Sequence, residues 1–64
     1  MVDGYYSAVV KELRSLGFHH VSNAKGSHEK WVGAAGKTLI VPHNLMSRHT
    51  ANAILKDAGS AKKF

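Results

Sequence analysis

The residues of this chain best suited to chemistry are its five histidines: His19, His20, His28, His43 and His49. An imidazole has an ordinary pKa of about 6.5, so it can give or take a proton at neutral pH, and it is also the commonest metal ligand. The spacing disfavours a metal site. His19 and His20 are adjacent in a segment expected to be a strand, so they point to opposite faces. The other three show no His-Glu-x-x-His arrangement, and the chain has no cysteine. We therefore expect neither a metal nor another cofactor.

His28 has the surroundings that phosphate chemistry needs, within the segment 25–31 (KGSHEKW). Gly26 lets an anionic backbone approach closely, and Lys25 and Lys30 stand on either side of the histidine. RNA can be cleaved without a metal when a base takes the proton of the ribose 2′-hydroxyl, which attacks the adjacent phosphate, and an acid protonates the leaving 5′-oxygen. His28 suits either proton transfer. Taken alone, Gly-Ser-His is a weak motif, and a histidine that only caps a turn is the plainer interpretation.

Several residues around this segment could contact RNA. Ser27 could orient His28 or bind the scissile phosphate, but capping the turn is equally consistent with its position. His43 could be a second acid or base, or it could bond to nearby backbone. Trp31 could stack on a base, although a packing role is favoured in so small a core. The candidate RNA-binding residues are Lys25, Gly26, Ser27, Lys30, Lys37 and His43.

Length, charge and the lack of long apolar runs limit the classes of protein to which this chain could belong. The chain has 64 residues, with nine Lys and Arg against four Asp and Glu, for a formal net charge of +5. This length predicts one domain over residues 1–64. The basic balance favours anionic partners, nucleic acid first, but on charge alone an excess of lysine that only solubilises a small domain is equally consistent. No apolar run approaches the roughly 20 residues that span a bilayer. The N-terminus has no signal-peptide pattern, so we expect a cytoplasmic protein that does not bind membranes.

Two helices are predicted at the ends of the chain. Residues 5–16 carry an apolar stripe with Asp3 as N-cap and Gly17 as the terminator, after which Phe18 folds back on Leu13. That stripe consists of Tyr6, Val9, Val10, Leu13 and Leu16. A second helix is capped by Ser47 or Thr50, continues through Ala51, Ile54, Leu55 and Ala58, and ends at Gly59. Residues 60–64 are expected to form a flexible basic tail.

Three strands are predicted between the helices. Residues 18–23, 27–32 and 37–41 show β-prone composition, with turn signals at 25–26 and 33–36 and a stop at Pro42. The order is α-β-β-β-α, an α+β fold whose three-stranded antiparallel sheet is covered on one face by the two helices. The expected sheet contribution to the core is Phe18, Val21, Trp31, Leu39 and Val41. If Trp31 is buried, strand alternation turns His28 outward.

Four segments together resemble the HicA family, the small toxins of bacterial and archaeal toxin–antitoxin pairs. They are 13–18 (LRSLGF), 25–28 (KGSH) with Trp31 after it, 41–43 (VPH) and 53–59 (AILKDAG). No single segment is specific, but they occur in the family's order and at its spacing, and they cover nearly the whole chain. The resemblance implies a fold like a double-stranded-RNA-binding domain.

The resemblance also implies an activity and a partner. The activity is that of an mRNA interferase, a metal-independent endoribonuclease that cleaves mRNA with His28 as its catalytic histidine and so inhibits translation and growth. The partner is a HicB-type antitoxin. We expect this antitoxin to occlude His28 or the approach to it, since excluding the substrate suffices for inhibition. The alternative is a module that binds double-stranded RNA without cutting it, and cleavage in the presence of EDTA would separate the two. A DNA-binding accessory protein is a weaker alternative because the chain has no helix-turn-helix signature.

Overall fold

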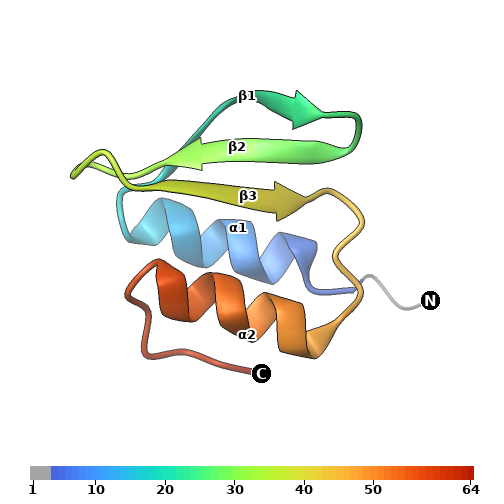
Figure 1. Cartoon of the computed structure of the whole chain (residues 1–64). Coiled ribbons are helices and arrows are strands. Elements are labelled where there is room, and N and C mark those ends of the chain that lie inside the picture. Colours follow the sequence, from blue (N-terminus) through green and yellow to red (C-terminus); the bar gives the residue numbers. More distant parts are fainter. Residues whose placement is uncertain (1–3) are drawn as a thin grey trace.

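The elements follow the predicted order. A computed structural model describes residues 4–64, apart from the side chains of residues 24 and 25. Its elements are α1 (Tyr6–Ser15), β1 (His19–Lys25), β2 (His28–Val32), β3 (Thr38–Pro42) and α2 (Arg48–Asp57). The strands form an antiparallel sheet in the order β1-β2-β3. Both helices lie on the same side of that sheet (Figure 1), which confirms the predicted α+β fold. We call the face covered by the helices the inner face and the opposite one the outer face.

Helix α1 ends at the predicted glycine. Gly17 has a φ of 92°, which is accessible to glycine because it has no Cβ. The N–H of Phe18 then donates to the carbonyl of Leu13 at 2.9 Å, the bond that defines a Schellman ending. At the other end of α1, Tyr5 occupies the N-cap position and makes no side-chain capping bond. The predicted cap, Asp3, lies outside the described residues.

Helix α2 begins and ends through local hydrogen bonds. Of the two candidate caps, Ser47 is the one used, and its hydroxyl accepts from the N–H of Thr50 at 3.3 Å. At the C-terminal end, Gly59 follows the helix and the N–H of Ser60 donates to the carbonyl of Leu55 at 2.9 Å. Neither helix in the described part of the chain is long and apolar enough to cross a membrane.

The last five residues lie against both helices, where the sequence predicts a flexible tail. The hydroxyl of Ser60 donates to Glu12 of α1 at 2.8 Å, and the ammonium group of Lys62 lies 3.5 Å from the same carboxylate. The N–H of Phe64 donates to the side chain of Asn52 in α2 at 2.7 Å. These bonds connect the C-terminal segment to each helix in turn.

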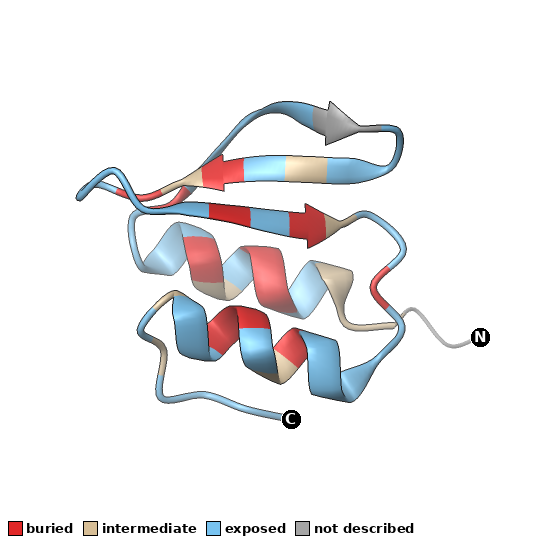
Figure 2. Ribbon diagram, in the orientation of Figure 1, coloured by how far each residue is buried: buried red, intermediate tan, exposed pale blue. Residues whose placement is uncertain are grey.

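The core lies between the helices and the inner face (Figure 2). Two predicted core residues are wrong: Val21 is 52% exposed and Leu16 is 38% exposed. In β1 it is His20, not Val21, that pairs with the buried Trp31, so alternation turns Val21 outward. Leu16 is the C-cap of α1, where the chain leaves the packed stripe. The buried residues are Val9, Val10, Leu13, Phe18, Trp31, Leu39, Val41, Leu45, Ala51, Ile54 and Leu55.

Leu45 is a core residue that the sequence pattern does not reveal. It lies in the segment between β3 and α2, expected only to be a loop, yet it is 2% exposed. Its carbonyl accepts from the N–H of Tyr5 at 2.7 Å, so this segment is fixed to the chain that enters α1. Because Leu45 is only two residues after His43, its burial also anchors one of the candidate site residues.

We predict that Leu45→Ala lowers the free energy of unfolding by about 2–4 kcal/mol, because the truncation leaves a cavity in the core. Urea denaturation followed by circular dichroism measures the change. The control is Met46→Ala, since the neighbouring Met46 is 51% exposed and its truncation should change stability by at most about 0.5 kcal/mol. Equal losses from the two variants would contradict the role assigned to Leu45.

Candidate functional site

The candidate site residues of strand β2 lie on both faces of the sheet. Trp31 is 1% exposed and belongs to the core, whereas His28 and Lys30 are exposed. Alternation places His28 and Lys30 together on the outer face and Glu29 with Trp31 on the inner one. This arrangement agrees with the expectation that burial of Trp31 turns His28 outward.

The turn before His28 is joined to the chain after β3. Gly26 has a φ of 56°, and apart from its two chain neighbours no described residue has an atom within 4 Å of where its Cβ would be, so its backbone is open to the rest of the described structure on that side. The carbonyl of Ser27 accepts from the N–H of His43 at 2.7 Å. His28 pairs across the sheet with Pro42, the residue just before His43. The backbones that carry Gly26, Ser27, His28 and His43 therefore meet at one end of the sheet.

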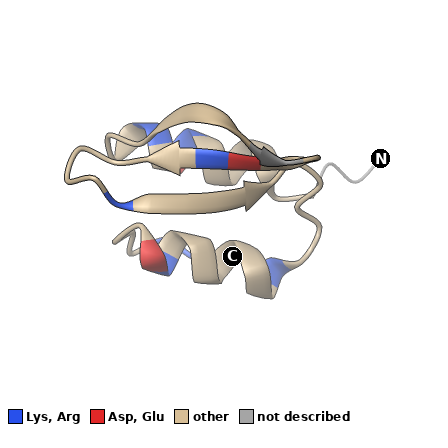
Figure 3. Ribbon diagram, turned by 45° about the horizontal axis from the view of Figure 1, so that its top comes forward, with Lys and Arg blue, Asp and Glu red and all other residues tan. Residues whose placement is uncertain are grey.

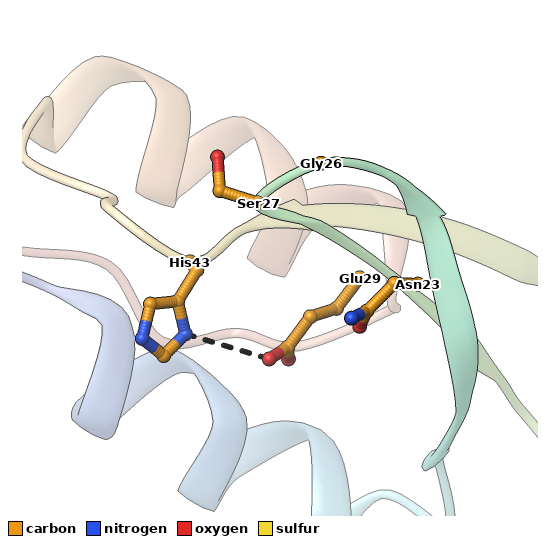
Figure 4. A pocket seen from close by; sticks show the side chains of 5 residues that line it. All are labelled: Asn23, Gly26, Ser27, Glu29 and His43. Carbon is orange, nitrogen blue, oxygen red and sulfur yellow. Dashed lines mark ion pairs between the residues drawn. The ribbon is translucent and has the colours of Figure 1, made fainter.

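A pocket of about 290 Å³ opens at this end of the sheet. Figure 4 shows the imidazole of His43 and the carboxylate of Glu29 turned toward one another, with the side chain of Asn23 beside them. The pocket is lined by Asn23, Gly26, Ser27, Glu29 and His43. His43 and Glu29 thus lie on the inner side of the sheet end, opposite the face that carries His28.

The carboxylate of Glu29 contacts three other side chains of this site. Its Oε1 accepts from the hydroxyl of Tyr6 at 2.6 Å and from Nε1 of Trp31 at 3.1 Å. Its Oε2 lies 3.5 Å from Nδ1 of His43. The rings of Tyr6 and His43 also pack against each other, with centroids 4.8 Å apart. Helix α1, strand β2 and the segment after β3 are therefore connected through one carboxylate.

Protonation states follow from these contacts. Partial burial by itself raises the pKa of Glu29, but the hydrogen bonds from Tyr6 and Trp31, the nearby His20 and the contact with His43 together lower it below 4.5. Burial, followed by the bond to Glu29 and its negative charge, raises the pKa of Tyr6 to about 12. At neutral pH the site therefore holds an ionised carboxylate and a protonated phenol.

The remaining candidate residues are spread over the molecule. Lys30 lies on the outer face with His28, but Lys37 is at the far end of the β2–β3 hairpin, where its carbonyl accepts from the N–H of Gly33 at 2.8 Å. The side chain of Lys25 lies outside the described part of the structure. Figure 3 shows the described Lys and Arg residues distributed over several elements. Of the five candidates that the structure describes in full, Gly26, Ser27 and His43 line the pocket.

Sequence reasoning missed Glu29 and Tyr6 as site residues. The signal for Glu29 was its spacing of two from Trp31, which places both on the same face of a strand. A carboxylate that faces inward needs hydrogen-bond donors. One of its donors, Tyr6, is 23 residues away in sequence, so the sequence pattern does not reveal the pair. Among the described residues, no three His, Asp or Glu side chains are grouped closely enough to hold a metal ion.

The arrangement of the elements defines a class of protein. An α-β-β-β-α domain with both helices on one face of the sheet is like a double-stranded-RNA-binding domain. The sequence profile of the HicA toxins of bacterial toxin–antitoxin systems matches residues 6–60 of the 64-residue chain. The chain therefore belongs to the HicA toxin family, in which each toxin has a cognate antitoxin. Neither a curated protein nor a solved structure gave a significant match.

We predict that Tyr6→Phe destabilises the protein by about 1–2 kcal/mol at neutral pH, because it removes a hydrogen bond to a charged group. The loss should diminish as the pH is lowered. A carboxyl group whose pKa is lowered in the folded state adds stability above its ordinary value of 4.5, and this stability is lost as the pH falls through the lowered pKa.

Urea denaturation of wild type and variant at neutral pH and below pH 4 tests the prediction. Tyr5→Phe is the matched control, because the hydroxyl of Tyr5 makes no hydrogen bond to the residues that the structure describes. A Tyr6→Phe effect that stayed constant with pH would show that the hydroxyl acts independently of the Glu29 charge.

Proposed function

We propose that this HicA toxin is an mRNA interferase, an endoribonuclease that cleaves mRNA in the cytoplasm without a metal and so inhibits translation and growth. The observation that carries the proposal is the placement of His28 at the start of β2, exposed and next to an open glycine turn. A phosphodiester can approach the Gly26 backbone closely, which brings it within reach of the His28 imidazole.

His28 carries out one of the two proton transfers of the reaction. The 2′-oxygen of the ribose attacks the adjacent phosphorus as its proton leaves, and the bond to the 5′-oxygen breaks as that oxygen gains a proton. Lys30, on the same face as His28, stabilises the negative charge on the phosphate oxygens. We assign the RNA contacts to Lys25, Gly26, Ser27, Lys30, Lys37 and His43.

The second candidate function is a module that binds double-stranded RNA without cutting it. The double-stranded-RNA-binding-domain-like arrangement of helices and strands favours it. The two functions differ in a single measurement, the length of an RNA after incubation with the protein and EDTA. Shortened RNA supports the interferase, and an intact RNA that only shifts on a native gel supports the binding module.

The proposed antitoxin is a HicB-type protein that inhibits by covering His28. His28 lies on an outer face that no helix covers, and a partner that seats there excludes RNA without changing the toxin's conformation. We expect carboxylates on the partner opposite Lys30, because complementary charge speeds encounter and fixes orientation. A structure of the pair in which His28 remained accessible would rule out inhibition by occlusion.

We predict that His28→Ala reduces RNA cleavage about 10²–10⁴-fold, the usual loss for a general acid or base, and abolishes growth inhibition. Cleavage of a labelled RNA in EDTA and growth after induction measure the two effects. The matched control is His49→Ala, which removes an exposed histidine from the start of α2. A folded His28→Ala protein that cleaved at the wild-type rate would disprove the assignment.

We predict that Lys30→Ala weakens RNA binding to a similar extent for different sequences and reduces the dependence of log K on log salt by about 0.7–0.9, the contribution of one phosphate contact. Lys63→Ala removes the same charge from the C-terminal segment and should leave the slope nearly unchanged. Fluorescence anisotropy across a salt series gives both values. Equal changes in the two variants would mean that binding depends only on net charge.

A further inference from the structure

Cleavage by the proposed route needs two proton-transfer groups, and His28 is only one of them. The base and the acid act on opposite sides of the phosphorus, because the attacking and leaving oxygens are roughly in line through it. A second group is therefore required near the β1–β2 turn, placed so that the scissile phosphate lies between it and His28. The side chains around the turn identify one.

His43 is held in place as a proton-transfer group would be. Its N–H donates to the carbonyl of Ser27 at 2.7 Å, which fixes its backbone beside the turn. Its Nδ1 lies 3.5 Å from Oε2 of Glu29, and the Tyr6 ring packs against its imidazole. The side chain is nevertheless 65% exposed. A carboxylate at Nδ1 orients an imidazole so that Nε2 is directed at the substrate, the arrangement found in catalytic triads.

The relative positions of the two histidines suit an in-line reaction. His43 comes one residue after Pro42, the cross-strand partner of His28. His28 projects from the outer face, and His43 lies with Glu29 on the inner side of the same sheet end. The RNA path that we infer crosses the open Gly26 turn, over the end of the sheet where the backbones of His28 and His43 meet. On that path the scissile phosphate has one imidazole on each side.

We propose that His43 is a second catalytic residue of this protein and that Glu29 is the residue that positions it. This inference rests on the proposed ribonuclease function. One imidazole accepts the proton of the 2′-hydroxyl as the bond between the 2′-oxygen and phosphorus forms. The other gives its proton to the 5′-oxygen as the bond between that oxygen and phosphorus breaks. The products are a 2′,3′-cyclic phosphate and a 5′-hydroxyl, and proton exchange with water restores both histidines.

The first experiment measures what His43 and Glu29 contribute. His43→Ala should reduce cleavage about 10²–10⁴-fold. Glu29→Gln keeps an oxygen that can accept from Tyr6 and Trp31 but removes the negative charge next to Nδ1, and it should reduce cleavage in the same direction. Binding of an RNA with a 2′-deoxyribose at the cleavage site should fall much less than the cleavage rate does in both variants, since His43 is only one of the assigned RNA contacts and Glu29 is not among them. Circular dichroism confirms that each variant is folded, and His49→Ala is the control.

The second experiment distinguishes proton transfer from a structural role. In a substrate whose 5′-bridging oxygen is replaced by sulfur, the leaving group departs without an acid. Exactly one of the two variants, His28→Ala or His43→Ala, should recover a near-wild-type rate with this substrate, since one residue is the acid and the other is the base. Glu29→Gln should behave as His43→Ala does in this comparison, which a merely structural carboxylate would not.

The outcomes separate the two levels of the proposal. If the wild-type protein cleaves neither substrate in EDTA, the ribonuclease function is wrong. If the wild-type protein cleaves and His43→Ala cleaves equally well, only the assignment of His43 is wrong. Recovery of both histidine variants, or of neither, would likewise overturn the two-histidine mechanism. A Glu29→Gln protein that is folded and fully active would overturn the positioning role.

Discussion

The carboxylate of Glu29 is the contact on which the arrangement of this small domain depends. It accepts hydrogen bonds from α1 through Tyr6 and from β2 itself through Trp31, and it contacts His43 in the segment after β3. A half-buried charge costs free energy unless it has donors, and here the donors come from parts of the chain distant in sequence. The same carboxylate also contacts the imidazole of His43, whose backbone is fixed by its bond to Ser27.

The division of the candidate site into two faces follows from the geometry of one strand. Successive side chains of β2 alternate, so His28 and Lys30 point away from the helices while Glu29 and Trp31 point toward them. Strand alternation thus separates a solvent-accessible imidazole from the buried network that organises the other side. His43 reaches the second side because the chain turns after Pro42 toward the buried Leu45.

The parts of the structure that the sequence predicted are those that depend on neighbouring residues. Gly17 and Ser47 affect only the backbone of residues a few positions away, so the end of α1 and the start of α2 could be predicted. The burial of Trp31 followed from its size, and the exposure of His28 followed from that of Trp31. Leu45 and the partners of Glu29 could not be found in this way. Their environments are created by residues such as Tyr5 and Tyr6, which approach them only once the chain has folded.

The irregular register of β1 has a consequence for the toxin when no antitoxin is bound. β1 is an edge strand, and its pairing with β2 shifts twice, between His20 and Ser22 and between Asn23 and Lys25. An uninterrupted edge offers its free amides and carbonyls to a second chain, and bulges break the straight row that such pairing needs. The other edge, β3, is only five residues long and ends in Pro42, which has no N–H to donate. Both borders of the sheet are thus poor templates for intermolecular strand addition.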